Sequence, residues 1–186
     1  MTDKQRAEFE HGPYRSEHDS IGERAGPRDV YYGVQSLRAV ENFPITGLTM
    51  HREIINTIAE IKKASAITNY EIGLLDKKVA DAIVRACEEI VEGSLHEEFI
   101  VDPIQGGAGT SLNMNANEVI ANRANEIAGE KLIHPNDHSN MSQSSNDTFP
   151  TAMHIAAATE IEDKLFPAID RLTATFDRLM KENEGI

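Results

Sequence analysis

Two polar loops stand out in the sequence because each gathers small hydrogen-bond donors just before a predicted helix. Residues 106–111 have the sequence Gly-Gly-Ala-Gly-Thr-Ser, and residues 139–147 have the sequence Ser-Asn-Met-Ser-Gln-Ser-Ser-Asn-Asp. Glycines let backbone N–H groups approach a ligand closely, and a helix start adds partial positive charge. Hydroxyl and amide groups donate to carboxylate oxygens without adding net charge. Together the loops fit a small dicarboxylate, although either loop alone is more typical of an ordinary connection.

A short histidine-containing segment raises the question of a metal site. His134, Asp137 and His138 lie close together in the sequence. Zinc sites usually need three or four ligands at helical or cysteine-rich spacing, and Pro135 makes this segment a turn, so we expect no metal. His154 lies beside apolar residues on a predicted helix, where histidine is more often a core or interface residue than a catalyst. Residue order shows no arrangement of serine or cysteine with histidine that is typical of nucleophilic catalysis.

The rest of the chain predicts a mainly α fold whose helices position the two loops. In the first predicted helix, from residue 50, the apolar face consists of Ile54, Ile58, Ile61, Ala64 and Ile67. A second helix over residues 76–93 follows, with Asp76 as its N-cap, and a third ends near Gly129. The glycine-rich loop leads directly into this third helix. Residues 1–48 lack a helical period and predict an irregular arm with a small β element that includes residues 30–32.

A fourth helix follows the polar, aperiodic stretch 130–149. We expect Pro150 in its first turn and a kink or interruption at Pro167. This helix carries the apolar seam of a helical bundle, formed by Ile161, Leu165, Ile169, Leu172, Phe176 and Leu179. The partner helices of that seam are absent from the chain.

Charge and composition exclude several functions. The 186 residues include 31 acidic and 18 basic side chains, giving a formal net charge of −13. This balance argues against binding to nucleic acid or to anionic lipid, and it makes neutral donors necessary for any anionic substrate. Cys87 is the one cysteine and lies among apolar positions, which predicts a buried, inert thiol. We find neither a signal peptide nor an apolar run long enough to span a membrane, and we expect a cytoplasmic protein.

In order and spacing, several segments of the chain resemble the aspartase/fumarase superfamily. Residues 14–23 and 31–45 resemble the N-terminal arm of that family. Residues 106–111, followed by Asn-Met-Asn-Ala-Asn-Glu at 113–118, resemble its first substrate loop, and residues 144–147 resemble its second. This joint match extends far beyond a single short motif and covers nearly the whole chain.

The resemblance implies an anti-elimination from a small dicarboxylate without a cofactor, in a homotetramer with composite active sites. It assigns substrate binding to Thr110, Ser144, Ser145 and Asn146, and a second anion site to His134, Asn136 and Asp137. It places the catalytic base, a serine on a mobile loop, beyond Ile186, so we expect the isolated chain to be inactive. It also implies an N-terminal lyase domain over residues 1–141 and the truncated start of a central helical bundle over residues 142–186.

Different residues of the sequence favour different branches of the superfamily. Residues 105–111 and 32–35 are more similar to ammonia-lyases than to fumarases, whereas Ser145 is more typical of fumarases. The ammonia-lyase interpretation leads, and the hydratase interpretation stays open. A third hypothesis, from a different class, is a non-catalytic helical module that serves as an assembly partner.

Overall fold

The N-terminal arm begins with a small β-hairpin. The computed structural model describes residues 13–19 and 21–185, so the first twelve residues of the predicted arm lie outside the described residues. Strand β1 (Tyr14–Asp19) pairs antiparallel with β2 (Gly22–Pro27). The predicted β element is thus confirmed, but residues 30–32 are not part of it. The backbone N–H groups of Tyr31 and Tyr32 instead donate to the Glu98 carboxylate.

Helix α2 (Val34–Asn42) corrects the prediction that the arm contains no helix. Its N-terminal N–H groups are satisfied by Glu118, a buried residue of a later helix. The Glu118 carboxylate accepts from the backbone N–H groups of Gly33, Gln35 and Ser36 and from the Ser36 hydroxyl, at 2.6–3.1 Å. Because this cap comes from a residue distant in the sequence, the local sequence of the arm does not reveal the helix.

Three helices form the core that carries the first loop. They are α3 (Arg52–Glu71), α4 (Lys77–Val91) and α5 (Thr110–Ala128). In α4, the predicted face is confirmed, since Val79, Ile83 and Ile90 are buried. In α5, Val119 and Ile120 are buried, and Gly129 ends the helix as predicted, with φ 72°. Asp76 is the N-cap residue of α4, although its side chain makes no capping hydrogen bond.

The buried face of α3 is rotated relative to the prediction. Ala64 and Ile67, expected inside, are exposed. Ile58 is buried as predicted, and Ile54 and Ile61 are half-buried against the core. The other buried positions, which were not predicted, are Ile55, Thr57, Ala59, Lys62, Ala66 and Asn69. The prediction was wrong because it ranked positions by apolar character, whereas a lysine and an asparagine lie on the core-facing side.

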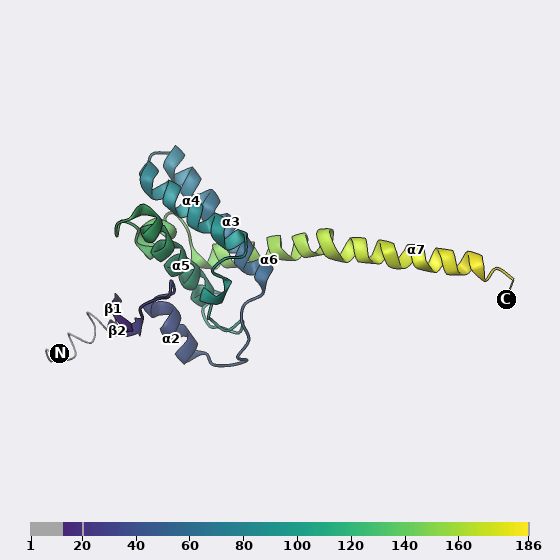
Figure 1. Cartoon of the computed structure of the whole chain (residues 1–186), viewed down its shortest axis with the longest axis horizontal. Coiled ribbons are helices and arrows are strands. Elements are labelled where there is room, and N and C mark those ends of the chain that lie inside the picture. Colours follow the sequence, from purple (N-terminus) through teal and green to yellow (C-terminus); the bar gives the residue numbers. More distant parts are fainter. Residues whose placement is uncertain (1–12, 20, 186) are drawn as a thin grey trace.

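The C-terminal helices form a rod. Helix α6 (Ser145–Glu160) continues through a π-helical turn (Ile161–Leu165) into α7 (Phe166–Glu182), and Figure 1 shows the rod leaving the packed helices. Helix α6 begins five residues earlier than expected, so Pro150 lies inside the helix and not in its first turn. The predicted interruption at Pro167 is confirmed as a π-helical turn, because proline lacks the N–H that would continue the α ladder.

The first part of α6 is packed and the rest of the rod is not. Thr148, Ala152 and Ala156 of α6 are buried, and α6 contacts α3 and α5. Helix α7 has no buried residue, and the predicted seam is exposed. No helix in the described part of the chain is both long enough and apolar enough to cross a membrane.

Candidate functional site

The glycine-rich loop makes a tight turn that ends at the start of α5. Gly107, Ala108 and Gly109 all have positive φ, at 71°, 53° and 86°. Since the N-cap residue Gly109 has no side chain, Gln105 takes over the capping role. Its Oε1 accepts from the Leu112 backbone N–H at 2.8 Å, and its Nε2 donates to the Asp102 carbonyl at 3.1 Å. Gln105 therefore connects the segment before the loop to the first turn of α5, and no charged side chain caps this helix.

Asp102 anchors the segment that precedes this loop. Its carboxylate accepts from the backbone N–H groups of Thr46, Gly47 and Ile104 and from the Thr46 hydroxyl. Burial raises the pKa of Asp102, but these hydrogen bonds outweigh burial and lower the pKa to about 2. The carboxylate is therefore ionised at neutral pH, and it accepts hydrogen bonds from the end of the arm in this charged form.

Side-chain hydrogen bonds from α3 anchor the second loop. Asn69 donates through Nδ2 to the Met141 carbonyl at 3.1 Å and accepts from the Ser142 hydroxyl at 3.0 Å. Ser144 is the N-cap residue of α6, and its carbonyl accepts from both the backbone N–H and the hydroxyl of Thr148, each at 2.9 Å. The Ser144 hydroxyl makes no capping hydrogen bond and is exposed.

Two contacts bring the loops together. The Phe149 ring lies against Gly109, where an added Cβ would be 2.0 Å from the ring. Asn113 of α5 donates through Nδ2 to the Ser145 Oγ at 2.8 Å. The starts of α5 and α6 are therefore neighbours, and their partial positive charges act on the same region. In a chain with a net charge of −13, this arrangement supplies the local attraction that an anionic ligand needs.

The predicted binding residues offer neutral donors at these two helix starts. Thr110, Ser144 and Asn146 are exposed, and Ser145 is half-buried. Because the Ser145 Oγ already accepts from Asn113, its own hydrogen is free to donate outward. The Thr110 hydroxyl donates to the Gly107 carbonyl at 2.5 Å, so it must turn away from that carbonyl before it can donate to a ligand. Chemically, this set can bind and polarise a carboxylate.

The histidine segment is a turn, as Pro135 predicted, within the longer stretch 130–149 that was predicted to be a loop. Pro135–Ser139 forms a π-helical turn with His134 as its N-cap residue. The His134 Nδ1 accepts from the backbone N–H groups of Asn136 and Asp137 at 3.3 Å, and the His138 Nδ1 accepts from the His134 N–H at 2.8 Å. These bonds occupy one ring nitrogen of each histidine. Among the described residues, no group of three or more histidine, cysteine, aspartate or glutamate side chains is placed to hold a metal ion.

Two other sequence predictions meet different outcomes. Cys87 is buried as predicted, and burial raises the pKa of its thiol, which agrees with the prediction that the thiol is inert. His154 is exposed, so it is not a core residue in this chain. Its assignment as an interface residue stays a prediction.

A cluster of amide side chains, which links the second loop to α3 and α5, was not predicted from the sequence. Asn140 Oδ1 accepts from Lys62 Nζ at 2.9 Å, from Asn113 Nδ2 at 3.1 Å and from Asn117 Nδ2 at 3.2 Å. Lys62 is fully buried, and this burial lowers its pKa to about 7. The sequence did contain one signal, since Lys62 stands four residues from both Ile58 and Ala66, on one face of α3.

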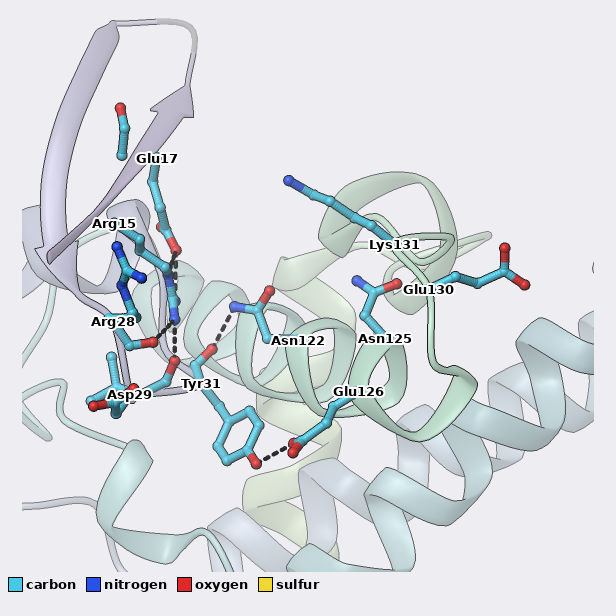
Figure 2. A pocket seen from close by; sticks show the side chains of 12 residues that line it. Arg15, Glu17, Arg28, Asp29, Tyr31, Asn122, Asn125, Glu126, Glu130 and Lys131 are labelled. Atoms are coloured by element: carbon cyan, nitrogen blue, oxygen red, sulfur yellow. Dashed lines mark hydrogen bonds and ion pairs between the residues drawn. The ribbon is translucent and has the colours of Figure 1, made fainter. Parts of the chain in front are cut away.

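A cleft of about 690 Å³ lies elsewhere, between the hairpin and the C-terminal half of α5. Figure 2 shows its lining, where the Tyr31 hydroxyl donates to Glu126 and Asn122 donates to the Tyr31 carbonyl. Arg15 donates to the carbonyls of Val30 and Tyr32 and pairs with Glu17. The two Tyr31 bonds tie the arm to α5, whereas the Arg15 bonds connect parts of the arm with one another. None of the predicted substrate-binding residues lines this cleft, so we do not assign the substrate to it.

Comparison with known proteins identifies the family. The protein family described as Lyase matches residues 22–186. An aspartate ammonia-lyase of a Bacillus species is 59% identical over 147 residues, covering 76% of this chain and 31% of the relative. A class II fumarate hydratase of Campylobacter jejuni is 52% identical over 178 residues, covering 93% of this chain and 38% of the relative. The chain thus spans less than two fifths of the length of either relative.

A solved structure agrees with these sequence matches. The crystal structure of fumarate lyase:delta crystallin from Brucella melitensis in native form superposes with a TM-score of 0.90 at 46% identity. The match covers 93% of this chain and 42% of the other. The chain belongs to the aspartase/fumarase superfamily of lyases, as the resemblance of its two loops predicted. Overall identity does not separate the two branches. The aspartate ammonia-lyase is more identical to this chain, but its match covers fewer residues than the match to the fumarate hydratase.

Proposed function

We propose that this chain is the N-terminal portion of an aspartate ammonia-lyase, which eliminates ammonia from L-aspartate in a reversible anti-elimination that gives fumarate. The observation that carries this proposal is the pairing of two helix starts, α5 and α6, through Asn113 and Ser145. This pairing gathers neutral donors where a dicarboxylate needs them. The ammonia-lyase branch is favoured by residues 105–111 and 32–35 of the sequence.

In this proposal, the substrate carboxylates and the amino group form hydrogen bonds with Thr110, Ser144, Ser145 and Asn146. Elimination begins when a base removes a proton from the carbon beside one carboxylate, and that carboxylate takes up the developing negative charge. Preorganised donors at the two helix starts stabilise this charge more than they stabilise the ground state. The base serine is expected outside these residues, so we expect the isolated chain to be inactive.

The assembly is part of the same proposal. We assign residues 1–141 to an N-terminal lyase domain and residues 142–186 to the start of a central helical bundle in a cytoplasmic homotetramer. The exposed seam of α7 supports this assignment, because its apolar side chains need partner helices. His134, Asn136 and Asp137 remain candidates for a second anion site. Their side chains are exposed on the π-helical turn, where a small anion has access.

A class II fumarate hydratase is the second candidate, and Ser145 is the residue that favours it. The deciding experiment assays the complete polypeptide that the gene encodes, with L-aspartate and with L-malate in separate reactions. Formation of fumarate is followed by its ultraviolet absorbance. We expect L-aspartate to be the preferred substrate. Preference for L-malate would establish the hydratase instead.

Site variants test the donors directly. We expect Thr110→Ala and Ser145→Ala each to lower kcat/KM by about 100-fold, the usual effect of losing a donor to developing negative charge. Ser94→Ala, an exposed serine after α4, is the matched control and should stay within about 2-fold of the parent. Unchanged kcat/KM in both site variants would remove the two loops from the mechanism.

If the complete polypeptide ends at Ile186 and turns over neither acid, the third hypothesis takes the lead. It describes a non-catalytic helical module that assembles with a full-length lyase through α7. Association with a full-length subunit, without binding of either dicarboxylate, would support it.

A further inference from the structure

The least expected side chain in the core is a lysine. Lys62 lies in the middle of α3, is fully buried, and is among the largest fully buried side chains of the described residues. A buried lysine is unfavourable unless its Nζ finds a partner, because an ammonium or amine leaves water at a considerable cost in free energy. The partner is a single amide oxygen, Asn140 Oδ1, at 2.9 Å.

That oxygen is the centre of the amide cluster. Asn140 Oδ1 also accepts from Nδ2 of Asn113 and of Asn117, which lie one turn apart on α5. The Asn140 Nδ2 donates to the Gln143 carbonyl at 3.2 Å. Three donors on its oxygen and one acceptor on its nitrogen hold the Asn140 amide in this orientation, whereas the Oδ1 atoms of Asn113 and Asn117 are buried without a hydrogen-bond partner among the described residues. Lys62 thereby links α3, α5 and the second loop through one atom.

The cluster continues to a predicted substrate donor. The Asn113 Nδ2 that donates to Asn140 Oδ1 also donates to Ser145 Oγ at 2.8 Å. The position of the Asn113 amide therefore decides which lone pair of Ser145 is occupied, and so the direction in which the Ser145 hydrogen points. A relay of three residues, Lys62, Asn140 and Asn113, runs from the core to the site.

We propose that Lys62 is a positioning residue, which fixes the Asn140 and Asn113 amides so that the Ser145 hydroxyl donates toward the substrate. This proposal rests on the proposed function of Ser145 as a substrate donor. Lys62 does not touch the substrate, since its Nζ is buried and hydrogen-bonded to Asn140.

The chemistry of the surroundings agrees with this role. Burial lowers the pKa of Lys62 to about 7, and both its protonated and neutral forms keep N–H groups that donate to Asn140. The titratable group that faces it from α4 is Cys87, whose raised pKa keeps the thiol neutral. A neutral apolar side chain of similar length fills the same volume but removes the shortest of the three hydrogen bonds to Asn140 Oδ1.

The test compares two neighbouring lysines in the complete polypeptide. Lys62→Met keeps the length of the side chain and removes the donor, whereas Lys63→Met is the control, since Lys63 is half-buried and pairs with Glu88. We expect Lys62→Met to lower kcat/KM by about 10-fold or more and Lys63→Met to stay within about 2-fold. Circular dichroism and thermal unfolding establish that each variant is folded.

A double-mutant cycle with Ser145→Ala separates positioning from a purely structural role. If Lys62 acts through Ser145, Lys62→Met should have almost no further effect on kcat/KM in the Ser145→Ala background. Multiplying effects, with the same 10-fold loss in both backgrounds, would overturn the proposal. The cycle thus uses a readout that simple destabilisation does not move.

A second variant and an activity-independent measurement cover the remaining outcomes. If Lys62→Met does not fold, Asn140→Leu removes the acceptor from the same relay and enters the same cycle.

Amide hydrogen exchange of residues 139–146 should accelerate in Lys62→Met but not in Lys63→Met. Unchanged exchange would overturn the positioning role even in a protein that turns over neither acid. Absence of turnover in the parent, by contrast, would overturn the proposed function alone.

Discussion

The packed helices α3, α4 and α5 and the rod helix α7 share one apolar pattern but differ in what covers it. Each packed helix has an apolar face with helical spacing, and its central isoleucine is fully buried. These residues are Ile58, Ile83 and Ile120. Leu172 and Phe176 recur at the same spacing in α7 and are 54% and 56% exposed. Apolar spacing therefore predicts which face of a helix needs a partner. It does not say whether the partner belongs to the same stretch of chain.

The two regions also differ in how polar groups are used. In the packed region, buried polar side chains hold neighbouring segments, Glu118 through four hydrogen bonds and Lys62 through one. In the rod, Arg178 and Glu182 form an exposed pair within one helix. Buried polar groups specify a unique arrangement because each lost bond leaves an unsatisfied partner, whereas water replaces an exposed pair at little cost. Three pairs of variants probe this difference in the 186-residue chain.

The largest expected effect is the loss of a core side chain. Ile120→Ala should lower the free energy of unfolding by about 2–5 kcal/mol, because it leaves a cavity in α5 that its neighbours fill only partly. Leu172→Ala, at an exposed position of α7, should change it by about 0.5 kcal/mol or less. Urea unfolding followed by circular dichroism measures both. Equal effects would show that α7 is already packed in the isolated chain.

A pH-dependent effect distinguishes two lysines. Burial lowers the folded-state pKa of Lys62 to about 7 from its usual 10.5, so between these values the unfolded chain binds one more proton than the folded chain. Stability should therefore rise with pH across this window, by at most about 1.4 kcal/mol per pH unit, and should lose this dependence below it. The slope should disappear in Lys62→Met.

The control for this measurement is Lys164, an exposed lysine of the rod. A hydrogen bond to Glu160 raises its pKa above 10.5, so it stays protonated in both states throughout the same window. Lys164→Met should therefore leave the slope between about pH 7 and about pH 9 unchanged. Urea titrations at several pH values give the comparison, and a parent protein without any slope would show that Lys62 is charged in the folded state.

Much of the packed region was predictable because its signals are local. The face of α4 and the end of α5 at Gly129 followed from apolar spacing and from a glycine stop. The two substrate loops were identified from their composition and from the family resemblance. Their roles as substrate-binding loops stay predictions, and the structure adds that the loops are neighbours.

The errors arose where distant residues decide a local structure. Helix α2 was missed because Glu118 caps it from α5, and the face of α3 was misplaced because Lys62 and Asn69 lie inside. The early start of α6 at Ser145 lies in a stretch without an apolar period, and its neighbour there is Asn113 of α5. The relay behind Ser145 is likewise a tertiary feature. No pattern within a single segment brings Lys62, Asn140 and Asn113 together.

The smallest expected differences come from exchanging carboxylates for amides in the two regions. In Glu118→Gln, one oxygen still accepts hydrogen bonds, but the new amide N–H₂ faces backbone N–H donors at the start of α2. At least one buried donor then loses its acceptor, which should lower the free energy of unfolding by about 1–3 kcal/mol and expose α2 to faster hydrogen exchange. Glu182→Gln breaks only the exposed pair with Arg178 and should change stability by about 0.5 kcal/mol or less. If Glu118→Gln is as mild as Glu182→Gln, the arm is held mainly by its apolar contacts and by its hydrogen bonds to Glu98 and Asn122, and the capping role of Glu118 is minor.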